Sequence, residues 1–307
     1  MIADQQLAYI LRQTLHDDIT TLQLIGVPYS SNRVYGVTTA AGRRYVVKQP
    51  KQIRESMSPF WQQMDAIFGV NSVTQLATVR SVSERLQQQT IIPAPQVIHV
   101  EADAGGLDAP FVVLTHLAGA AHEPDDFPDG EALHDQLGQF IGYLHAQPYA
   151  GFGNVLMEPL RPQADFLPMM MTAMRQTIQR FWTDCPPLHE YLDNLAAITD
   201  DDTIFSSASL IMIDISGNQF VYDGHRISGV VDLDAYVIGP REWELSTLEL
   251  GISAPEAFRQ GYERYRPLPT FAPFRRFYRF WMYLNEPGDG YHADRLAQFM
   301  KQTIHFA

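Results

Sequence analysis

Strand patterns and helix patterns occupy different parts of this sequence, and that segregation limits the folds the chain can adopt. Behind a first predicted helix, β-branched and aromatic residues dominate three short runs, at 34–37, 45–48 and 111–114. Helical periodicity is found in longer segments, at 53–89, 132–147, 163–183, 186–198 and 241–307. We therefore predict an α+β fold, with a β-rich N-terminal lobe (1–115) and a mainly helical C-terminal lobe (116–307).

The composition is that of an ordinary globular protein. The 307 residues are 46% hydrophobic and 19% charged, which excludes wholesale disorder. Cys185 is the only cysteine, so an internal disulfide and a cysteine-based metal cluster are excluded. Aromatic residues between 271 and 283 recur at helical spacing, which favours core packing over a platform for stacking bases.

The charge balance disfavours anionic partners. The formal net charge is -13, and such a chain binds nucleic acid or anionic lipid poorly. No apolar run approaches the ~20 residues that span a bilayer, and Asp4 stands where a signal peptide would be basic. We expect a cytoplasmic protein without nucleic-acid or membrane partners.

A β-rich island at 210–234 interrupts the helical part and carries two carboxylates. An apolar strand ends at Asp214, a polar loop follows with the amides Asn218 and Gln219, and a later apolar strand ends at Asp232. An Asp-Gly turn between the loop and Asp232 predicts a hairpin, so these side chains should converge at one end of it. Carboxylate and amide oxygens are ligands that Mg²⁺ prefers, so the island predicts a magnesium site.

The island resembles the catalytic loop and metal-binding hairpin of the aminoglycoside phosphotransferase and choline kinase family. The usual pattern of that family is His-Gly-Asp, four residues, Asn, a hairpin and a second Asp. Further segments resemble family segments in the same order: Ser31–Tyr35, Val46–Lys48, Leu137–His145 with Gly151–Gly153, and Gly239–Leu245. Together they extend over nearly the whole chain, and the resemblance implies a bilobal protein-kinase-like fold.

The resemblance also implies an activity. The chain would be an ATP- and Mg²⁺-dependent phosphotransferase that moves the γ-phosphoryl group to a hydroxyl of a small molecule, such as an aminoglycoside, an amino alcohol or a sugar. Asp214 would be the catalytic residue that accepts or orients the proton of the attacking hydroxyl. Asp232 would hold the Mg²⁺ that bridges the phosphates.

Residues that would bind the nucleotide are implied in the N-terminal lobe and the linker after it. Lys48 would neutralise phosphates, Asn32 lies in the segment that resembles the nucleotide loop, and the linker at Thr115 and Leu117 would offer backbone groups to adenine. A kinase-like site also needs a helical glutamate to hold the lysine. Glu84 is nearest, but it lies off the apolar face of its helix, so this partner is left unassigned.

The sequence departs from the family pattern inside the catalytic loop. Met212 stands where the family has a histidine that braces the loop, and methionine cannot make those hydrogen bonds. Ungapped spacing puts Gln219 at the metal-binding amide, whereas a one-residue deletion would put Asn218 there. Asp234 is either an additional metal contact or a solvated turn carboxylate.

Two functions are compatible with these features. The first is an active small-molecule kinase, favoured because Asp214, Asp232 and Lys48 are all present. The alternative is a catalytically inactive, kinase-like protein that binds a nucleotide or another ligand, and Met212 motivates it.

The acidic stretch 121–135 fits a cationic acceptor, and equally a solvated loop. The acceptor and the oligomeric state are left open.

Overall fold

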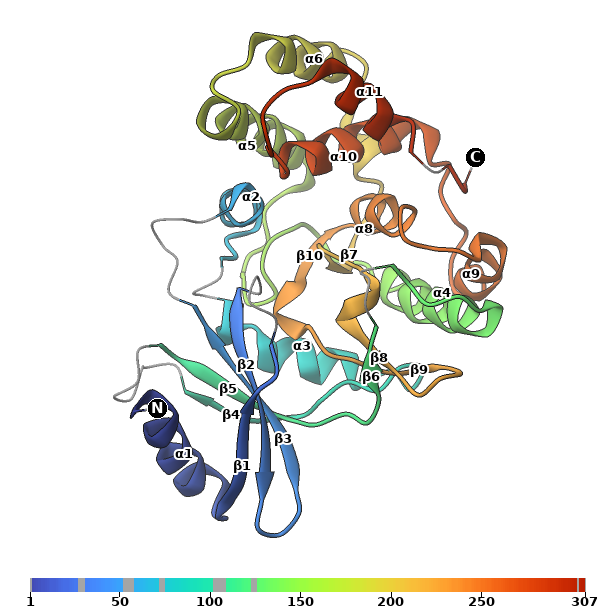
Figure 1. Cartoon of the computed structure of the whole chain (residues 1–307). Coiled ribbons are helices and arrows are strands. Elements are labelled where there is room, and N and C mark those ends of the chain that lie inside the picture. Colours follow the sequence, from blue (N-terminus) through green and yellow to red (C-terminus); the bar gives the residue numbers. More distant parts are fainter. Residues whose placement is uncertain are drawn as a thin grey trace.

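The computed structural model describes residues 2–26, 31–51, 58–71, 75–101, 109–122, 126–302 and 304–306. It confirms the predicted fold class. An antiparallel sheet forms the N-terminal part, and helices make up most of the remainder of the chain (Figure 1).

The N-terminal sheet has the strand order β1-β2-β3-β5-β4 and is antiparallel throughout. Its strands are β1 (Ile19–Leu24), β2 (Asn32–Thr39), β3 (Arg44–Pro50), β4 (Val97–Glu101) and β5 (Phe111–Thr115). Side chains alternate between the two faces, as the strand period requires. Val47 and Val113 pack with helix α1 (Ile2–Leu15), whereas Val112 and Leu114 join the main core.

Two helices in the segment between β3 and β4 connect the sheet to the rest of the molecule. Helix α2 (Pro59–Phe68) packs against α5 (Phe166–Phe181), and the Phe68 ring contacts Trp243 in the helical part (Figure 1). Helix α3 (Val79–Leu86) follows the short turn η2 (Gln75–Ala77) and lies against the later turn η5. Residues 52–57 and 72–74 of the predicted helical stretch lie outside the described residues.

Short strands form the centre of the molecule. The predicted hairpin is confirmed as β8 (Phe220–Tyr222) with β9 (Ile227–Val230), and β6 (Ala120–Ala121) extends it. The strand before the catalytic loop, β7 (Ala208–Met212), pairs instead with β10 (Tyr236–Pro240). The polar loop includes the turn η4 (Gly217–Gln219), and η5 (Leu233–Ala235) joins β9 to β10.

Apart from the short α7, which lies outside them, the remaining helices follow the predicted segments closely. They are α4 (Glu131–His145), η3 (Gln163–Asp165), α5, α6 (Pro186–Ala196), α7 (Asp201–Ile204), α8 (Arg241–Leu248), α9 (Pro255–Tyr262), α10 (Ala272–Leu284) and α11 (Ala293–Met300). The aromatic residues of α10 are buried, which confirms core packing. Among the described residues, no helix has both the length and the hydrophobicity to cross a bilayer.

Helices α4 and α9 approach so closely that glycines are required between them. A Cβ atom at Gly138 would lie 2.1 Å from the carbonyl oxygen of Phe258, and one at Gly261 would lie 2.1 Å from the carbonyl oxygen of Asp135. Both contacts are with backbone, which cannot rotate away. This close contact fixes α4, whose last residue supports the catalytic loop described below.

We predict that Gly138→Ala lowers the unfolding free energy by about 1–3 kcal/mol, because the new methyl group forces the two helices apart. Thermal unfolding measures the loss. Gly36→Ala is the matched control, since its Cβ would have no neighbour closer than 3.5 Å. An unchanged melting temperature for Gly138→Ala would contradict the close packing of α4 on α9.

Candidate active site

A lysine of the N-terminal sheet joins two carboxylates of the central strands. Lys48 of β3 forms ion pairs with Asp232, just after β9, and with Asp234 in η5. Asn32, the first residue of β2, donates from Nδ2 to Oδ2 of Asp234 at 2.8 Å. Lys48, Asn32 and Asp232 therefore lie in one cluster, as the sequence analysis implied.

One lysine shared by two carboxylates sets their protonation. Burial and the charge of Asp234 raise the pKa of Asp232 to about 7. Lys48 and the hydrogen bond from Asn32 lower the pKa of Asp234 to about 2, although burial opposes this. The pKa of Lys48 is raised above its ordinary value by both carboxylates. The cluster thus holds a surplus of negative charge, which favours a cation at Asp232.

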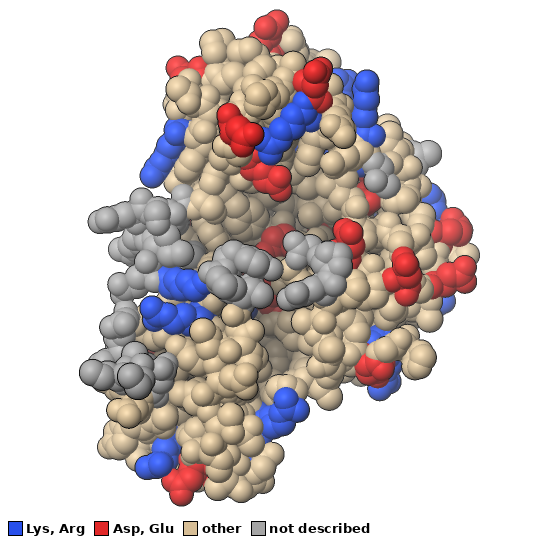
Figure 2. Space-filling model, in the orientation of Figure 1, with Lys and Arg blue, Asp and Glu red and all other residues tan. Residues whose placement is uncertain are grey.

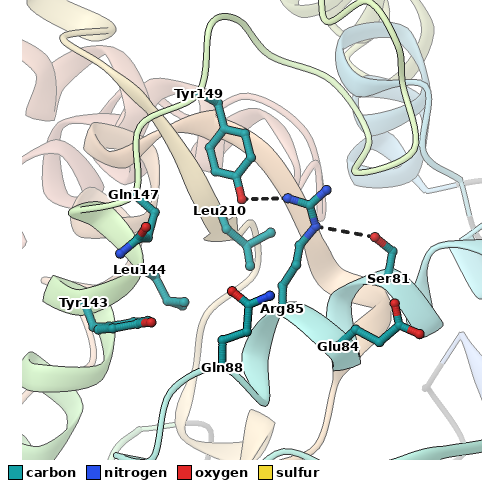
Figure 3. Close-up of a pocket in the computed structure, with 9 residues that line it drawn as sticks. All are labelled: Ser81, Glu84, Arg85, Gln88, Tyr143, Leu144, Gln147, Tyr149 and Leu210. Carbon is teal, nitrogen blue, oxygen red and sulfur yellow. Dashed lines mark hydrogen bonds between the residues drawn. The ribbon is translucent and has the colours of Figure 1, made fainter.

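The structure decides between the alternatives for Asp234 and answers the question of the Lys48 partner. Asp234 is only 3% exposed, so its interpretation as a solvated turn carboxylate is wrong. Among the described residues, the ion-pair partners of Lys48 are Asp232 and Asp234. Glu84 is exposed and lines a separate cavity of about 330 Å³ between α3 and α4 (Figure 3). In that cavity Arg85 donates to the Tyr149 hydroxyl at 2.7 Å.

Asp214 lies just beyond β7, close to the lysine cluster. Its Oδ1 atom is out of contact with solvent and has no hydrogen-bond partner among the described residues. Burial, together with the charges of Asp232 and Asp234, raises the pKa of Asp214 to about 8. A carboxyl with an unused oxygen and a raised pKa is a stronger base than an ordinary aspartate, and its pKa suits proton transfer.

The catalytic loop is braced through its backbone. The Met212 N–H donates to Oε1 of Glu244 at 2.7 Å, and the Trp243 indole donates to the Ile213 carbonyl at 3.2 Å. The other oxygen of Glu244, Oε2, lies 2.6 Å from Nε2 of His145, and both side chains are fully buried. The main chain therefore supplies a brace that the Met212 side chain cannot.

Both candidate amides lie on η4, but their surroundings differ. The Asn218 side-chain oxygen accepts a hydrogen bond from the Ser216 hydroxyl at 2.8 Å. Gln219 is buried, and its carbonyl accepts from the N–H of Val231, the neighbour of Asp232. The main-chain carbonyl of Gln219 thus ties its backbone directly to the segment that carries Asp232.

Some backbone groups of the linker between the sheet and the helical part already form hydrogen bonds. The Thr115 N–H donates to the Gln96 carbonyl at 2.9 Å, and the His116 N–H donates to the Arg44 carbonyl. Leu117 packs against Gly229 of β9, so the linker connects the two sheets. Of the predicted linker residues, Leu117 is the better candidate for a backbone contact to adenine.

A space-filling view shows the surface hollowed between the N-terminal sheet and the helices, with acidic side chains visible inside (Figure 2). A further cavity of about 410 Å³ lies between the segment after β6 and the end of α8, and Asp126 and Asp129 line it. The Phe127 ring in the wall of this cavity contacts the Phe220 ring of β8. Residues 123–125 of the acidic stretch lie outside the described residues.

A family model described as the phosphotransferase enzyme family matches residues 26–277. The chain belongs to this family. The match covers the lysine strand, the catalytic loop and the hairpin, and it confirms the resemblance inferred from the sequence. No curated protein matched in a separate search.

Solved structures share the fold of this phosphotransferase-family protein at low sequence identity. A macrolide 2′-phosphotransferase from Brachybacterium faecium is 16% identical, with a TM-score of 0.61 over 97% of this chain and 98% of its own. A putative fructosamine-3-kinase from Thermobifida fusca is 15% identical, with a TM-score of 0.64 over 96% of this chain and 97% of its own. The ADP-bound aminoglycoside phosphotransferase APH(2″)-Ib is 13% identical, with a TM-score of 0.62 over 97% of this chain and 97% of its own.

Sequence analysis missed the residues that support the site from behind. Glu244 and Trp243 lie in the segment recognised by resemblance, but nothing in its pattern indicated a contact with the catalytic loop. His145 ends a segment that resembles the family, and nothing in the sequence pattern singled it out. The available signal was weak, because a buried Glu–His pair joins residues 99 positions apart.

We predict that Asp214→Asn raises the melting temperature at pH 8. The native pKa of about 8 exceeds the ordinary value of 3.8, so the folded wild type binds a proton more tightly than the unfolded chain and loses stability as pH rises from about 4 to 8. Asparagine does not titrate, so the advantage of the variant should grow over this range and level off above it. Thermal unfolding from pH 4 to 9 measures it.

The control is Asp223→Asn in the β8–β9 turn. Its carboxylate pairs with Arg226, and its pKa is lowered, so neutralising it should not stabilise the protein at pH 8. A difference between wild type and Asp214→Asn that does not depend on pH would disprove the raised pKa of Asp214.

Proposed function

We propose that this protein is an ATP- and Mg²⁺-dependent kinase that phosphorylates a hydroxyl group of a small molecule. The observation that carries the proposal is the bonding of Lys48 to Asp232 and Asp234 beside Asp214. Phosphoryl transfer uses these groups: a cation for phosphates, carboxylates for a metal, and a base for the hydroxyl. Family membership and the ADP bound to one structural relative support it.

The nucleotide would lie between the sheet and the hairpin. Lys48 would contact its phosphates, and Asn32, which already reaches across to Asp234, would lie beside them. Leu117, with Thr115, would offer backbone groups to adenine at the linker.

The donor groups around Asp232 fit a magnesium ion. Carboxylate and amide oxygens are hard ligands, and the raised pKa of Asp232 reflects negative charge that a cation would neutralise. Asp232 and Gln219 would hold the ion, with Asn218 as the alternative amide. Mg²⁺ bound there would neutralise charge on the phosphates during transfer.

Asp214 would orient the acceptor hydroxyl and take its proton. The hydroxyl oxygen forms a bond to the γ-phosphorus while the bond from that phosphorus to the bridging oxygen of ADP breaks. The proton of the hydroxyl passes to the Asp214 carboxylate.

We predict that MgATP raises the melting temperature and that Asp232→Ala removes the Mg²⁺-dependent part of this shift. Nucleotide at 100 times its Kd should stabilise the protein by about 2.7 kcal/mol. Hydrolysis of MgATP, with water as acceptor, should fall about 100-fold or more in Asp214→Ala. Thermal shift and ADP release measure the two effects.

Asp223→Asn again serves as the control and should match wild type in both assays. Equal MgATP hydrolysis by wild type and Asp214→Ala would contradict the proposed activity. If nucleotide still bound under those conditions, the inactive kinase-like alternative would be correct.

The acceptor is proposed to be cationic. Asp126 and Asp129 are exposed on the wall of the 410 Å³ cavity, whose Phe127 contacts Phe220 of β8, and the chain as a whole is acidic. A positively charged acceptor would gain Coulomb energy there and approach faster at low salt. Aminoglycosides and amino alcohols have this charge, whereas neutral sugars do not.

We predict that the double variant Asp126→Asn, Asp129→Asn raises the KM for a cationic acceptor about tenfold. The two lost charges weaken binding of the cation, whereas the KM for MgATP should not change, because neither residue belongs to the lysine cluster. Steady-state kinetics with paired amine and neutral alcohol acceptors checks this. An equal effect on both acceptors would contradict a cationic acceptor.

A further inference from the structure

Tyr236 is a buried tyrosine behind the catalytic loop that the proposed mechanism does not use. It is the first residue of β10 and pairs with Met212 of β7, two residues before Asp214. Its side chain is fully buried. The ladder between β7 and β10 therefore fixes its backbone next to the loop that carries Asp214.

The Tyr236 hydroxyl has no hydrogen-bond partner among the described residues. Burying an unbonded hydroxyl costs about 1–3 kcal/mol in proteins, so an unused phenol here would be worse than phenylalanine. Burial raises the pKa of this hydroxyl far above its ordinary value, and three nearby carboxylates raise it further: Glu244, Asp232 and Asp214. A phenol in such surroundings remains protonated and can act only as a donor to them.

Two of these carboxylates already have donors. Glu244 accepts from the Met212 N–H and is paired with His145. Asp232 is paired with Lys48. Asp214 differs, because its Oδ1 is buried and has no partner in the described part of the chain. The Tyr236 hydroxyl is therefore a donor without a partner, and Oδ1 of Asp214 is an acceptor without one, among the described residues. Tyr236 begins β10, and Asp214 lies just beyond β7, the partner strand of β10.

We propose that Tyr236 is a positioning residue for Asp214, donating its hydroxyl hydrogen to Oδ1 through one buried water. The bond would orient the carboxylate and stabilise its ionised form, which is the form able to take a proton. A buried site with polar groups on two sides suits a bridging water. The role in catalysis rests on the proposed function, whereas the bond itself does not.

Tyr236→Phe removes only the hydroxyl. We expect kcat for MgATP hydrolysis to fall about tenfold. The variant loses a hydrogen bond to a charged carboxylate, and about 1.4 kcal/mol in the activation barrier corresponds to a tenfold change in rate. The KM for MgATP should not change, because the residue does not reach the nucleotide groups. At pH 9, where Asp214 is ionised, the melting temperature should fall, because the bond to its carboxylate is lost.

Tyr278→Phe is the matched control on α10. Its hydroxyl donates to the Ile204 carbonyl at 2.5 Å, so its loss should lower the melting temperature and leave kcat and KM unchanged. A Tyr236→Phe enzyme with wild-type kcat would overturn the positioning role.

A double-mutant cycle tests the bond without any activity. Tyr236→Phe, Asp214→Ala and the double variant are unfolded thermally at pH 9, where Asp214 is ionised. We expect the change in melting temperature of the double variant to differ by about 2 °C or more from the sum of the changes in the two single variants. Additive shifts would overturn the inference, whereas equal MgATP hydrolysis by wild type and Asp214→Ala would overturn the proposed function alone.

Discussion

The site depends on one lysine that holds two carboxylates. Lys48 comes from the N-terminal sheet, and its partners Asp232 and Asp234 lie 184 and 186 residues further along the chain. Burial and the charge of Asp234 raise the pKa of Asp232, whereas Lys48 lowers the pKa of Asp234. The same contacts that join the sheet to the central strands thus leave a negative charge where a metal cation would bind.

Asp214 is placed by a second set of buried polar contacts. Glu244 and Trp243 of α8 bind the backbone on either side of the Met212–Ile213 peptide, and His145 at the end of α4 supports Glu244. Because every residue except proline has a backbone N–H, this brace tolerates methionine where the family has histidine. The brace leaves Oδ1 of Asp214 unsatisfied, as expected of a group kept for a substrate or a positioning donor.

Local features were predictable because short-range patterns encode them. The turn at Asp223–Gly224 and the apolar runs around it predicted the β8–β9 hairpin, and the resemblance brought Lys48 and Asp232 to one site. Other features depended on contacts between distant segments. Nothing in the sequence indicated that β7 pairs with β10, that Asp234 is buried, or that Phe68 of α2 packs into the helical part.

The sequence by itself determined the element types, the phosphotransferase family and the residue types available for chemistry, because these follow from periodicity, turn residues and motif order. Only the tertiary structure decided which groups meet. It assigned Lys48 to two aspartates instead of Glu84, and it set Tyr236 behind Asp214. The physical reason is that burial and pairing depend on distances between residues far apart in the chain, which spacing along a sequence does not specify.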